Sequence, residues 1–170
     1  MPFTPIHMGP GILIKGLLQG GFSLMVFGWT QIVMDIQPLI VMLTGEGHLH
    51  GVTHTYIGAT LLAVLSALTG KPLSQLGLLL LRITPAAQDI RWRVAYLSAF
   101  IGAYSHVFFD SIMHSDLQPF YPVSLKNSVL GMISIDLLHT LCLFGGVVGA
   151  VIYYTFPYLQ KQLTRRNHNS

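Results

Sequence analysis

The chain has little charge, little cysteine and no strand-like alternation. Of its 170 residues, 9% are Asp, Glu, Lys or Arg, against about 25% in an ordinary soluble domain. Because 52% of the residues are apolar, the chain is not intrinsically disordered, which would require low hydrophobicity and high charge. The single cysteine, Cys142, excludes a disulfide scaffold. The nine Lys and Arg residues form no dense stripe, so no nucleic-acid partner is expected and the composition predicts a small integral membrane protein.

Long runs without charge predict an all-α fold, an integral membrane bundle of about five or six helices, some short or re-entrant. Crossing the hydrocarbon takes about 20 apolar residues. Residues 137–160 reach that length outright, and residues 92–114 reach it with a polar inner end. Residues 55–70 form a shorter segment, which we expect to be tilted or flanked by other protein.

Glycine and proline divide the rest of the hydrophobic sequence. Two glycines at 20–21 separate an expected helix over residues 11–19 from another over residues 22–34. Pro38 is expected to interrupt the chain, and Pro72 is expected to open a new helix, because proline suits the first helical turn.

The distribution of basic residues predicts an orientation. Residues 1–160 form one membrane-embedded helical domain in this interpretation, and residues 161–170 form a basic cytoplasmic tail. Basic residues near helix ends favour the cytoplasmic side. They gather in one loop and in the tail, at Arg82, Arg91, Arg93, Lys161, Arg165 and Arg166. The loops around His50 and His114 then face the non-cytoplasmic side, in a multi-pass protein.

Histidine is abundant, since eight histidines stand against six acidic residues. An ionisable side chain within an apolar segment is costly and marks a functional site. His106, Asp110 and His114 follow one another at intervals of four, so they share one face of a helix. His50 and His54 repeat this interval, and both point the same way if a helix begins near His50.

Three further positions join this pattern. Asp136 and His139 lie three apart in the last apolar segment, on one side of a helix, where a structural pair or a proton relay is the alternative. If the first two helices form a hairpin, His7 and Asp35 return to the end where the other groups lie. The candidate metal ligands are His7, Asp35, His50, His54, His106, Asp110 and His114. The candidate catalytic residues are Asp136 and His139.

This set of imidazoles and carboxylates contains no thiolate. Such a set suits Zn²⁺, with Mn²⁺ and Fe²⁺ as alternatives. It holds more ligands than one tetrahedral ion uses, so two or three ions are expected, and clustered metals suit phosphoester hydrolysis.

Four features of the chain resemble a family of bacterial membrane-bound metal-dependent hydrolases. They are the opening MPFTPIH, Asp35 after a helical hairpin, the string HGVTHT at residues 50–55, and the pair His106 and Asp110 on a helix. Members of that family are small inner-membrane proteins, distantly similar to zinc-dependent phospholipase C and zinc single-strand nucleases. The resemblance covers about residues 1–140.

The resemblance implies a phospholipase C-like arrangement of helices, a bacterial inner-membrane location and metal-dependent hydrolysis of a lipid or lipid-linked phosphoester. Membrane lipid is then an expected partner, and Asp136 is expected to orient the attacking water or act as base. The chain departs from the family string in two ways. Thr55 replaces its serine, and the basic residue between the first histidine and the glycine is missing, which removes a bidentate grip on phosphate.

Two other functions fit the same residues. The cluster could belong to a non-catalytic membrane metal-binding protein, with the metal holding the bundle together. It could also line the path of an ion or proton transporter, which would spread polar residues across the whole bilayer. Residues 59–67 and 147–156 lack ionisable groups other than tyrosine, which favours a site at one face. The oligomeric state stays open.

Overall fold

The computed structural model describes residues 5–82 and 89–168, and all regular structure in these residues is helical. The α-helices are α1 (Met8–Leu18), α2 (Leu24–Thr44), α3 (Tyr56–Leu80), α5 (Trp92–Met113) and α6 (Ile135–His168). Three 3-10 segments are η1 (Pro5–His7), η2 (Gln19–Gly21) and η3 (Val52–His54). The predicted all-α membrane bundle is therefore confirmed.

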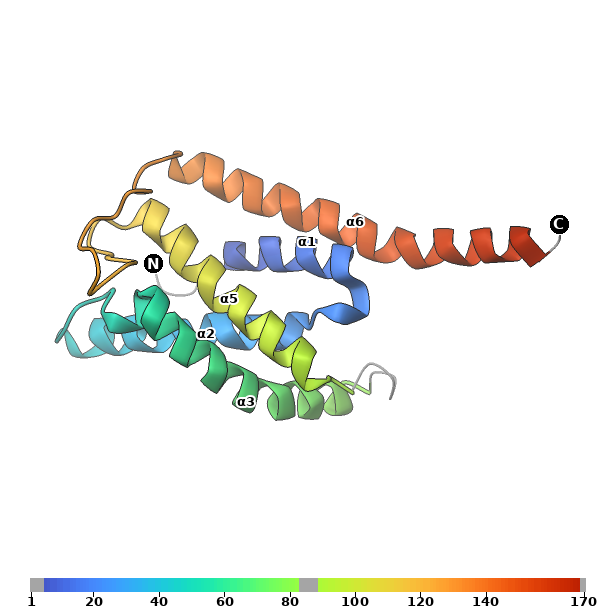
Figure 1. Cartoon of the computed structure of the whole chain (residues 1–170), viewed down its shortest axis with the longest axis horizontal. Coiled ribbons are helices and arrows are strands. Elements are labelled where there is room, and N and C mark those ends of the chain that lie inside the picture. Colours follow the sequence, from blue (N-terminus) through green and yellow to red (C-terminus); the bar gives the residue numbers. More distant parts are fainter. Residues whose placement is uncertain (1–4, 83–88, 169–170) are drawn as a thin grey trace.

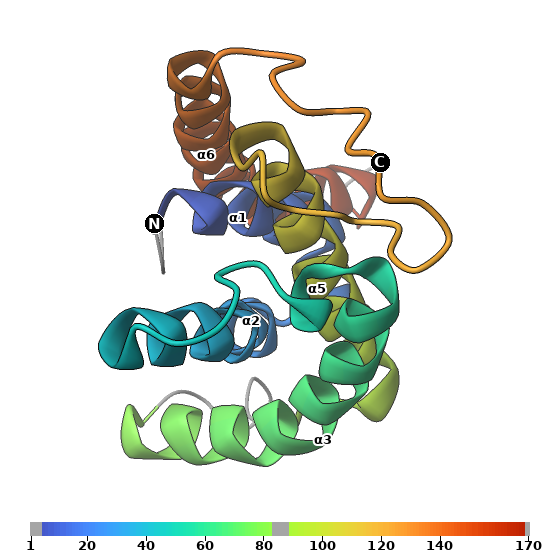
Figure 2. The ribbon, with the colours of Figure 1, turned by 90° about the vertical axis from the view of Figure 1, so that its left-hand side faces the viewer.

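The described helices alternate in direction along the chain (Figure 1). α1 packs along α6, while α2, α3 and α5 pack on one another, and Figure 2 shows these two layers from the end of the bundle. One end carries the loops at residues 45–55 and 114–134, and we call it the loop end. The other end carries η2, the end of α3 and the start of α5, and we call it the turn end.

The expected interruptions at Pro38 and Pro72 are wrong. α2 continues through Pro38 for 21 residues in all, and α3 continues through Pro72 for 25. A proline removes one backbone hydrogen bond of a helix, but a membrane helix tolerates this loss because neighbouring groups compensate. At about 1.5 Å per residue, both helices exceed the thickness of the hydrocarbon.

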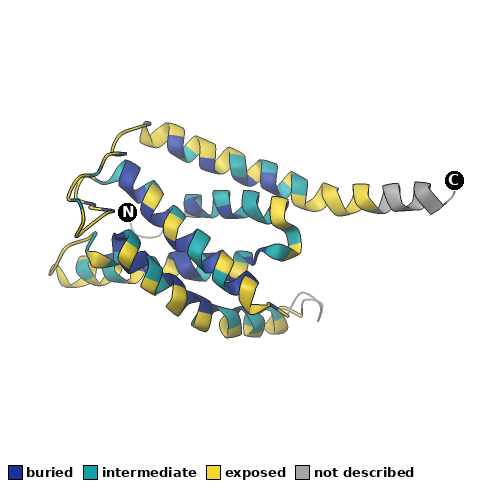
Figure 3. Cartoon of the chain, viewed as in Figure 1, coloured by how far each residue is buried: buried dark blue, intermediate teal, exposed yellow. Residues whose placement is uncertain are grey.

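Three described helices are consequently long and apolar enough to cross a membrane. They are α2, α3 and the part of α6 over Ile135–Gln160. The expectation that residues 55–70 form only a short segment is therefore also wrong. In Figure 3 the buried residues concentrate where α1, α2, α3 and α5 face one another, whereas α6 is largely exposed. Helix α6 continues past residue 160 without a break. The segment predicted to be a separate tail, residues 161–170, is therefore helical as far as His168.

Glycines bring α1 and α6 into backbone contact. A Cβ added at Gly9 would overlap the Cys142 carbonyl, and one added at Gly149 would overlap the backbone of Leu13. Small residues allow this close approach between membrane helices. Because His7 immediately precedes α1, this contact holds His7 against the rest of the bundle.

Hydroxyl caps fix the starts of two helices. The Ser23 hydroxyl accepts a hydrogen bond from the Val26 amide at the start of α2, at 3.3 Å. The Thr55 hydroxyl accepts one from the Gly58 amide at the start of α3, at 3.0 Å. Serine and threonine are preferred at this position, so the threonine found at residue 55 caps the helix as a serine would. The cap fixes the start of α3 two residues after His54.

Candidate metal centre

The structure brings all seven predicted ligands together at the loop end, where the α1/α6 layer meets the other layer. They form three groups, and within each group one ligand atom per residue lies within 4.8 Å of the others. The groups are His7, His106 and Asp110; Asp35, His54 and His106; and His50, Asp110 and His114. Since His106 and Asp110 each belong to two groups, the three groups form one connected cluster.

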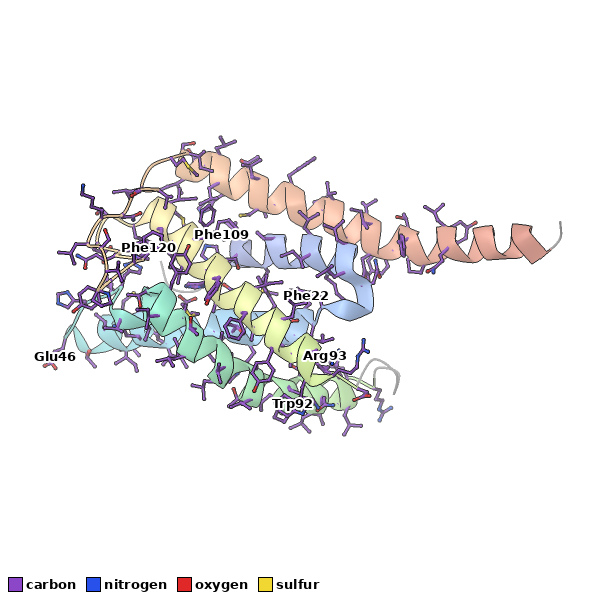
Figure 4. All side chains as sticks on the ribbon, viewed as in Figure 1. Phe22, Glu46, Trp92, Arg93, Phe109 and Phe120 are labelled. Atoms are coloured by element: carbon purple, nitrogen blue, oxygen red, sulfur yellow. The ribbon has the colours of Figure 1, made fainter. Side chains whose placement is uncertain are left out.

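Five imidazole rings run in a continuous row through this cluster. The ring centroids are 5.3 Å apart between His7 and His106, and 5.3 Å apart between His106 and His54. The row continues over 5.2 Å from His54 to His50 and over 4.3 Å from His50 to His114. The Phe109 and Phe120 labels in Figure 4 mark this end of the molecule, and the Phe109 ring stacks on His7 at 5.9 Å.

Asp110 lies at the centre of the row. Its Oδ1 is 3.8 Å from His7 Nε2, and its Oδ2 is 3.7 Å from His54 Nε2 and 3.3 Å from His106 Nε2. Asp35 Oδ1 lies 3.5 Å from His106 Nε2. Two carboxylates and three imidazoles, contributed by η1, α2, η3 and α5, thus surround one small volume.

Three nitrogen atoms in this volume lack hydrogen-bond partners. The Nε2 atoms of His7, His54 and His106 are buried, and none makes a hydrogen bond within the described part of the chain. Nearly all buried polar atoms in proteins are hydrogen-bonded, and an exception needs an explanation such as an ion. Three exceptions that all lie within 3.8 Å of an Asp110 oxygen fit a bound cation.

The opposite nitrogen of His106 is held in place. Its Nδ1 lies 2.8 Å from Gln31 Oε1, and Gln31 Nε2 donates to the Gly102 carbonyl at 3.0 Å. The carbonyl fixes the orientation of the Gln31 amide, so His106 Nδ1 must carry the proton that Gln31 Oε1 accepts. Nε2 of the neutral ring is therefore the unprotonated nitrogen, which is the form that binds metal.

A second chain of hydrogen bonds orients His54 in the same way. Gln37 Nε2 donates to the His48 carbonyl, and the Thr53 hydroxyl donates to Gln37 Oε1. Because that hydroxyl has only one proton, its oxygen accepts from His54 Nδ1 at 3.1 Å. His54 Nε2 is therefore also unprotonated when the ring is neutral and faces the cluster.

The residues Gln31, Gln37 and Thr53 were missed in the sequence because they are neutral and sit in ordinary helical or loop positions. Gln31 does precede Asp35 by four residues, and that spacing could have marked both as sharing a face of α2.

Burial keeps two of the ligands neutral. The pKa of His7 falls to about 4, chiefly because burial penalises its charged form. The pKa of His54 falls to about 4 for the same reason. Both imidazoles are therefore unprotonated at neutral pH, as metal ligation requires.

The third group lies nearer to solvent. His50 Nδ1 is 2.9 Å from Asp116 Oδ2, which positions this imidazole as a carboxylate positions many metal-ligating histidines. A pocket of about 360 Å³ opens beside it, and Thr55, Gln118 and Tyr121 line part of its wall. Of the seven ligands, His50 lines this pocket, so the pocket adjoins the outer edge of the cluster.

The backbone around these histidines differs from the helical pattern of the sequence in two places. The helix does not begin near His50, because η3 and the Thr55 cap place the start of α3 at Tyr56. His114 does not lie within a helix either, since α5 ends at Met113 and His114 has an extended backbone. The loops nevertheless bring His50 and His114 together.

The structure does not bring Asp136 into the cluster. Leu138 and Cys142 mark the buried face of α6, and Asp136, two residues before Leu138, points about 200° away from it. The Asp136 side chain is exposed. His139 is half-buried and close enough to His7 for their charges to interact, but it belongs to none of the three groups.

Comparison with known proteins gives one match. A family described as "YdjM inner membrane protein" matches residues 16–167, which include every ligand of the cluster except His7. No curated protein and no solved structure is significantly similar to the chain. The match agrees with the three helices that could cross a membrane, and it supports the inner-membrane part of the resemblance without bearing on hydrolysis. The chain belongs to the YdjM inner membrane protein family.

Proposed function

We propose that the loop-end cluster binds two or three divalent metal ions, most suitably Zn²⁺, and that the protein is a membrane-bound metal-dependent hydrolase of a phosphoester. The observation that carries the proposal is the set of three buried, unpartnered Nε2 atoms around Asp110 and Asp35. When bound, such ions supply Lewis acidity and lower the pKa of a water molecule to near neutrality.

The residues divide into a deep set and an outer set. His7, His54 and His106 with the two carboxylates form the deep set, which is buried. His50 and His114 form the outer set beside the pocket. Asp110 belongs to groups in both sets, so it would contribute a ligand atom to each set.

The distribution of polar residues favours a site over a transport path. Among the described residues, every buried histidine and every buried acid lies in the cluster. From the cluster toward the turn end, the buried side chains are uncharged and many are alanine, such as Ala63, Ala67, Ala95 and Ala99. A proton or ion path of this kind would require ionisable groups through the whole depth of the bilayer, whereas the buried polar side chains toward the turn end are hydroxyls, such as Ser66 and Ser98.

The setting supports a substrate that reaches the site from the membrane surface. Arg82, Arg91 and Arg93 lie at the turn end, so the positive-inside rule assigns that end to the cytoplasm and the cluster to the other side. A lipid or lipid-linked phosphoester could then present its headgroup to the loop-end pocket. The pocket lining contains neither lysine nor arginine, so the phosphate would have to be held by the ions and the histidines.

The test is hydrolysis by the detergent-purified protein of bis(p-nitrophenyl) phosphate and of phospholipid in mixed micelles. We expect hydrolytic activity that a chelator abolishes and Zn²⁺ restores. The Asp35→Asn variant should lose this activity, whereas Glu46→Gln, at an exposed position of the same end, should keep it. A protein that holds metal but hydrolyses neither class of ester contradicts the enzymatic part of the proposal. That result would favour a non-catalytic metal-binding membrane protein.

A further inference from the structure

The turn end carries a second pocket, on the opposite side of the molecule from the metal cluster. It has a volume of about 300 Å³ and lies where α1, α2, α3, α5 and α6 meet. Lys15 and Tyr153 contribute polar atoms to its wall, and Phe22, Met25, Leu78 and Val94 contribute apolar surface. Figure 4 labels Phe22 and Arg93 at this end.

Lys15 brings a partly buried ammonium group to this pocket. Its Nζ donates to the Gln19 carbonyl and to the Phe22 carbonyl, each at 2.8 Å. The same Nζ lies 5.6 Å from the centroid of the Tyr153 ring. An ammonium group has three protons to donate, so one remains for another acceptor. Within the described residues, no carboxylate forms an ion pair with Lys15.

We propose that this pocket binds an anionic phospholipid, with its phosphate on Lys15 and an acyl chain against the apolar wall. The charge around the pocket supports an anion, because Arg91 and Arg93 directly adjoin the lining residues Ile90 and Val94 at the start of α5. Basic pockets between membrane helices on the cytoplasmic side are typical sites for anionic headgroups.

The open side of the pocket favours a lipid over a soluble anion. Met25 is 42% exposed and Tyr153 is 38% exposed, so the wall is reached from the flank of the bundle, where the bilayer lies. Most of that wall is apolar. A soluble phosphate would leave this apolar surface unused, whereas an acyl chain would cover it.

Native mass spectrometry of the detergent-purified protein, after addition of phosphatidylglycerol or phosphatidylcholine, tests the proposal. We expect phosphatidylglycerol to be retained preferentially. Lys15→Gln should lower its retention about fivefold, the factor that one lysine contributes near an anionic surface. Lys15→Arg should retain most of the binding. The matched control is Lys71→Gln, which removes a charge at the same end outside the pocket and should change retention little.

A second variant separates the pocket from general surface charge. Met25→Trp fills the open side of the pocket, leaves every charge in place and should also lower phosphatidylglycerol retention. It keeps the test decisive if Lys15→Gln does not fold. Any of four results would overturn the proposal. Two concern the lipid itself: equal retention of phosphatidylglycerol and phosphatidylcholine, or displacement of the bound lipid by soluble glycerol phosphate. Two concern the variants: equal losses of retention in Lys15→Gln and Lys71→Gln, or unchanged retention in Met25→Trp. Metal content should stay unchanged in all four variants.

Discussion

The loop end and the turn end of the bundle carry their ionisable side chains in different ways. At the loop end, histidines and carboxylates from four separate segments are buried against one another, and three imidazole nitrogens lack partners. At the turn end, the arginines are exposed on single helix ends and loops. Exposed basic residues indicate which way a membrane protein is oriented. Buried polar atoms without partners cost free energy, so their concentration at one end indicates a function there.

The largest effect expected at the loop end follows removal of a deep imidazole. His54→Ala should lower zinc affinity more than about 100-fold, beyond the 10–100-fold loss typical of an outer-sphere partner. Zinc titration with a competing chelator measures this loss. His48→Ala is the control, because that side chain is exposed in the adjoining loop. Equal affinity in His54→Ala and wild type would mean that the loop-end imidazoles only pack.

The glutamine that orients His106 should matter less than a ligand. Gln31→Leu removes the acceptor for His106 Nδ1, so zinc affinity should fall about 10–100-fold, as for other outer-sphere partners. Gln75→Leu is the matched change on α3 away from the cluster, where Gln75 accepts from Lys71, and it should leave zinc affinity unchanged. Equal losses of zinc affinity in Gln31→Leu and Gln75→Leu would show that the effect of Gln31 is not specific to the loop end.

The pH dependence of unfolding should also originate at the loop end. The pKa values of His7 and His54 lie at about 4 in the folded protein, below the ordinary value of 6.5. As the pH falls from 6.5 toward 4, the unfolded chain therefore binds protons that the folded protein does not bind, and the metal-free protein loses stability. Above pH 6.5 these two histidines do not contribute to the change of the unfolding free energy with pH.

Denaturation of the metal-free protein in detergent between pH 7 and pH 4 measures this slope. His54→Asn should make the slope shallower, whereas His48→Asn should leave it unchanged. A slope that is the same in wild type and His54→Asn would show that the buried imidazole does not titrate in this way.

The smallest effect compares the two helix caps. Thr55→Ala and Ser23→Ala each remove a hydroxyl that accepts a backbone amide proton, and each should cost about 1 kcal/mol of stability. Only Thr55→Ala should also weaken zinc binding, because Thr55 follows His54 directly. Thr55→Ser should restore both properties. Zinc binding that weakens equally in Ser23→Ala would make the loss a general consequence of lower stability.

Much of the site could be predicted from the chain alone, because it depends on short-range spacing. The interval between His106 and Asp110 fixes both on one face of α5, whatever else the helix contacts. The hairpin of α1 and α2 brings His7 and Asp35 back to one end, and alternation of the later helices brings the remaining histidines to the same end (Figure 1).

The errors lie where non-local packing decides the outcome. The proline rules that predicted breaks in α2 and α3 describe helices with no neighbours to compensate a missing hydrogen bond. Asp136 faces outward because Leu138 and Cys142 set the rotation of α6, and the glycine contact with α1 holds it there. Neither the rotation of α6 nor the partner helix is encoded in the spacing of Asp136 and His139.

The zinc content of the purified protein decides whether the loop-end cluster is a metal site. Wild-type protein, purified with supplemented zinc and freed of excess metal, should hold at least one equivalent by inductively coupled plasma mass spectrometry. Asp110→Asn should lose most of that metal, because Asp110 belongs to two of the three ligand groups, while Glu46→Gln should keep it. Less than one equivalent of any transition metal in the wild-type protein, or equal metal in Asp110→Asn, would contradict the account.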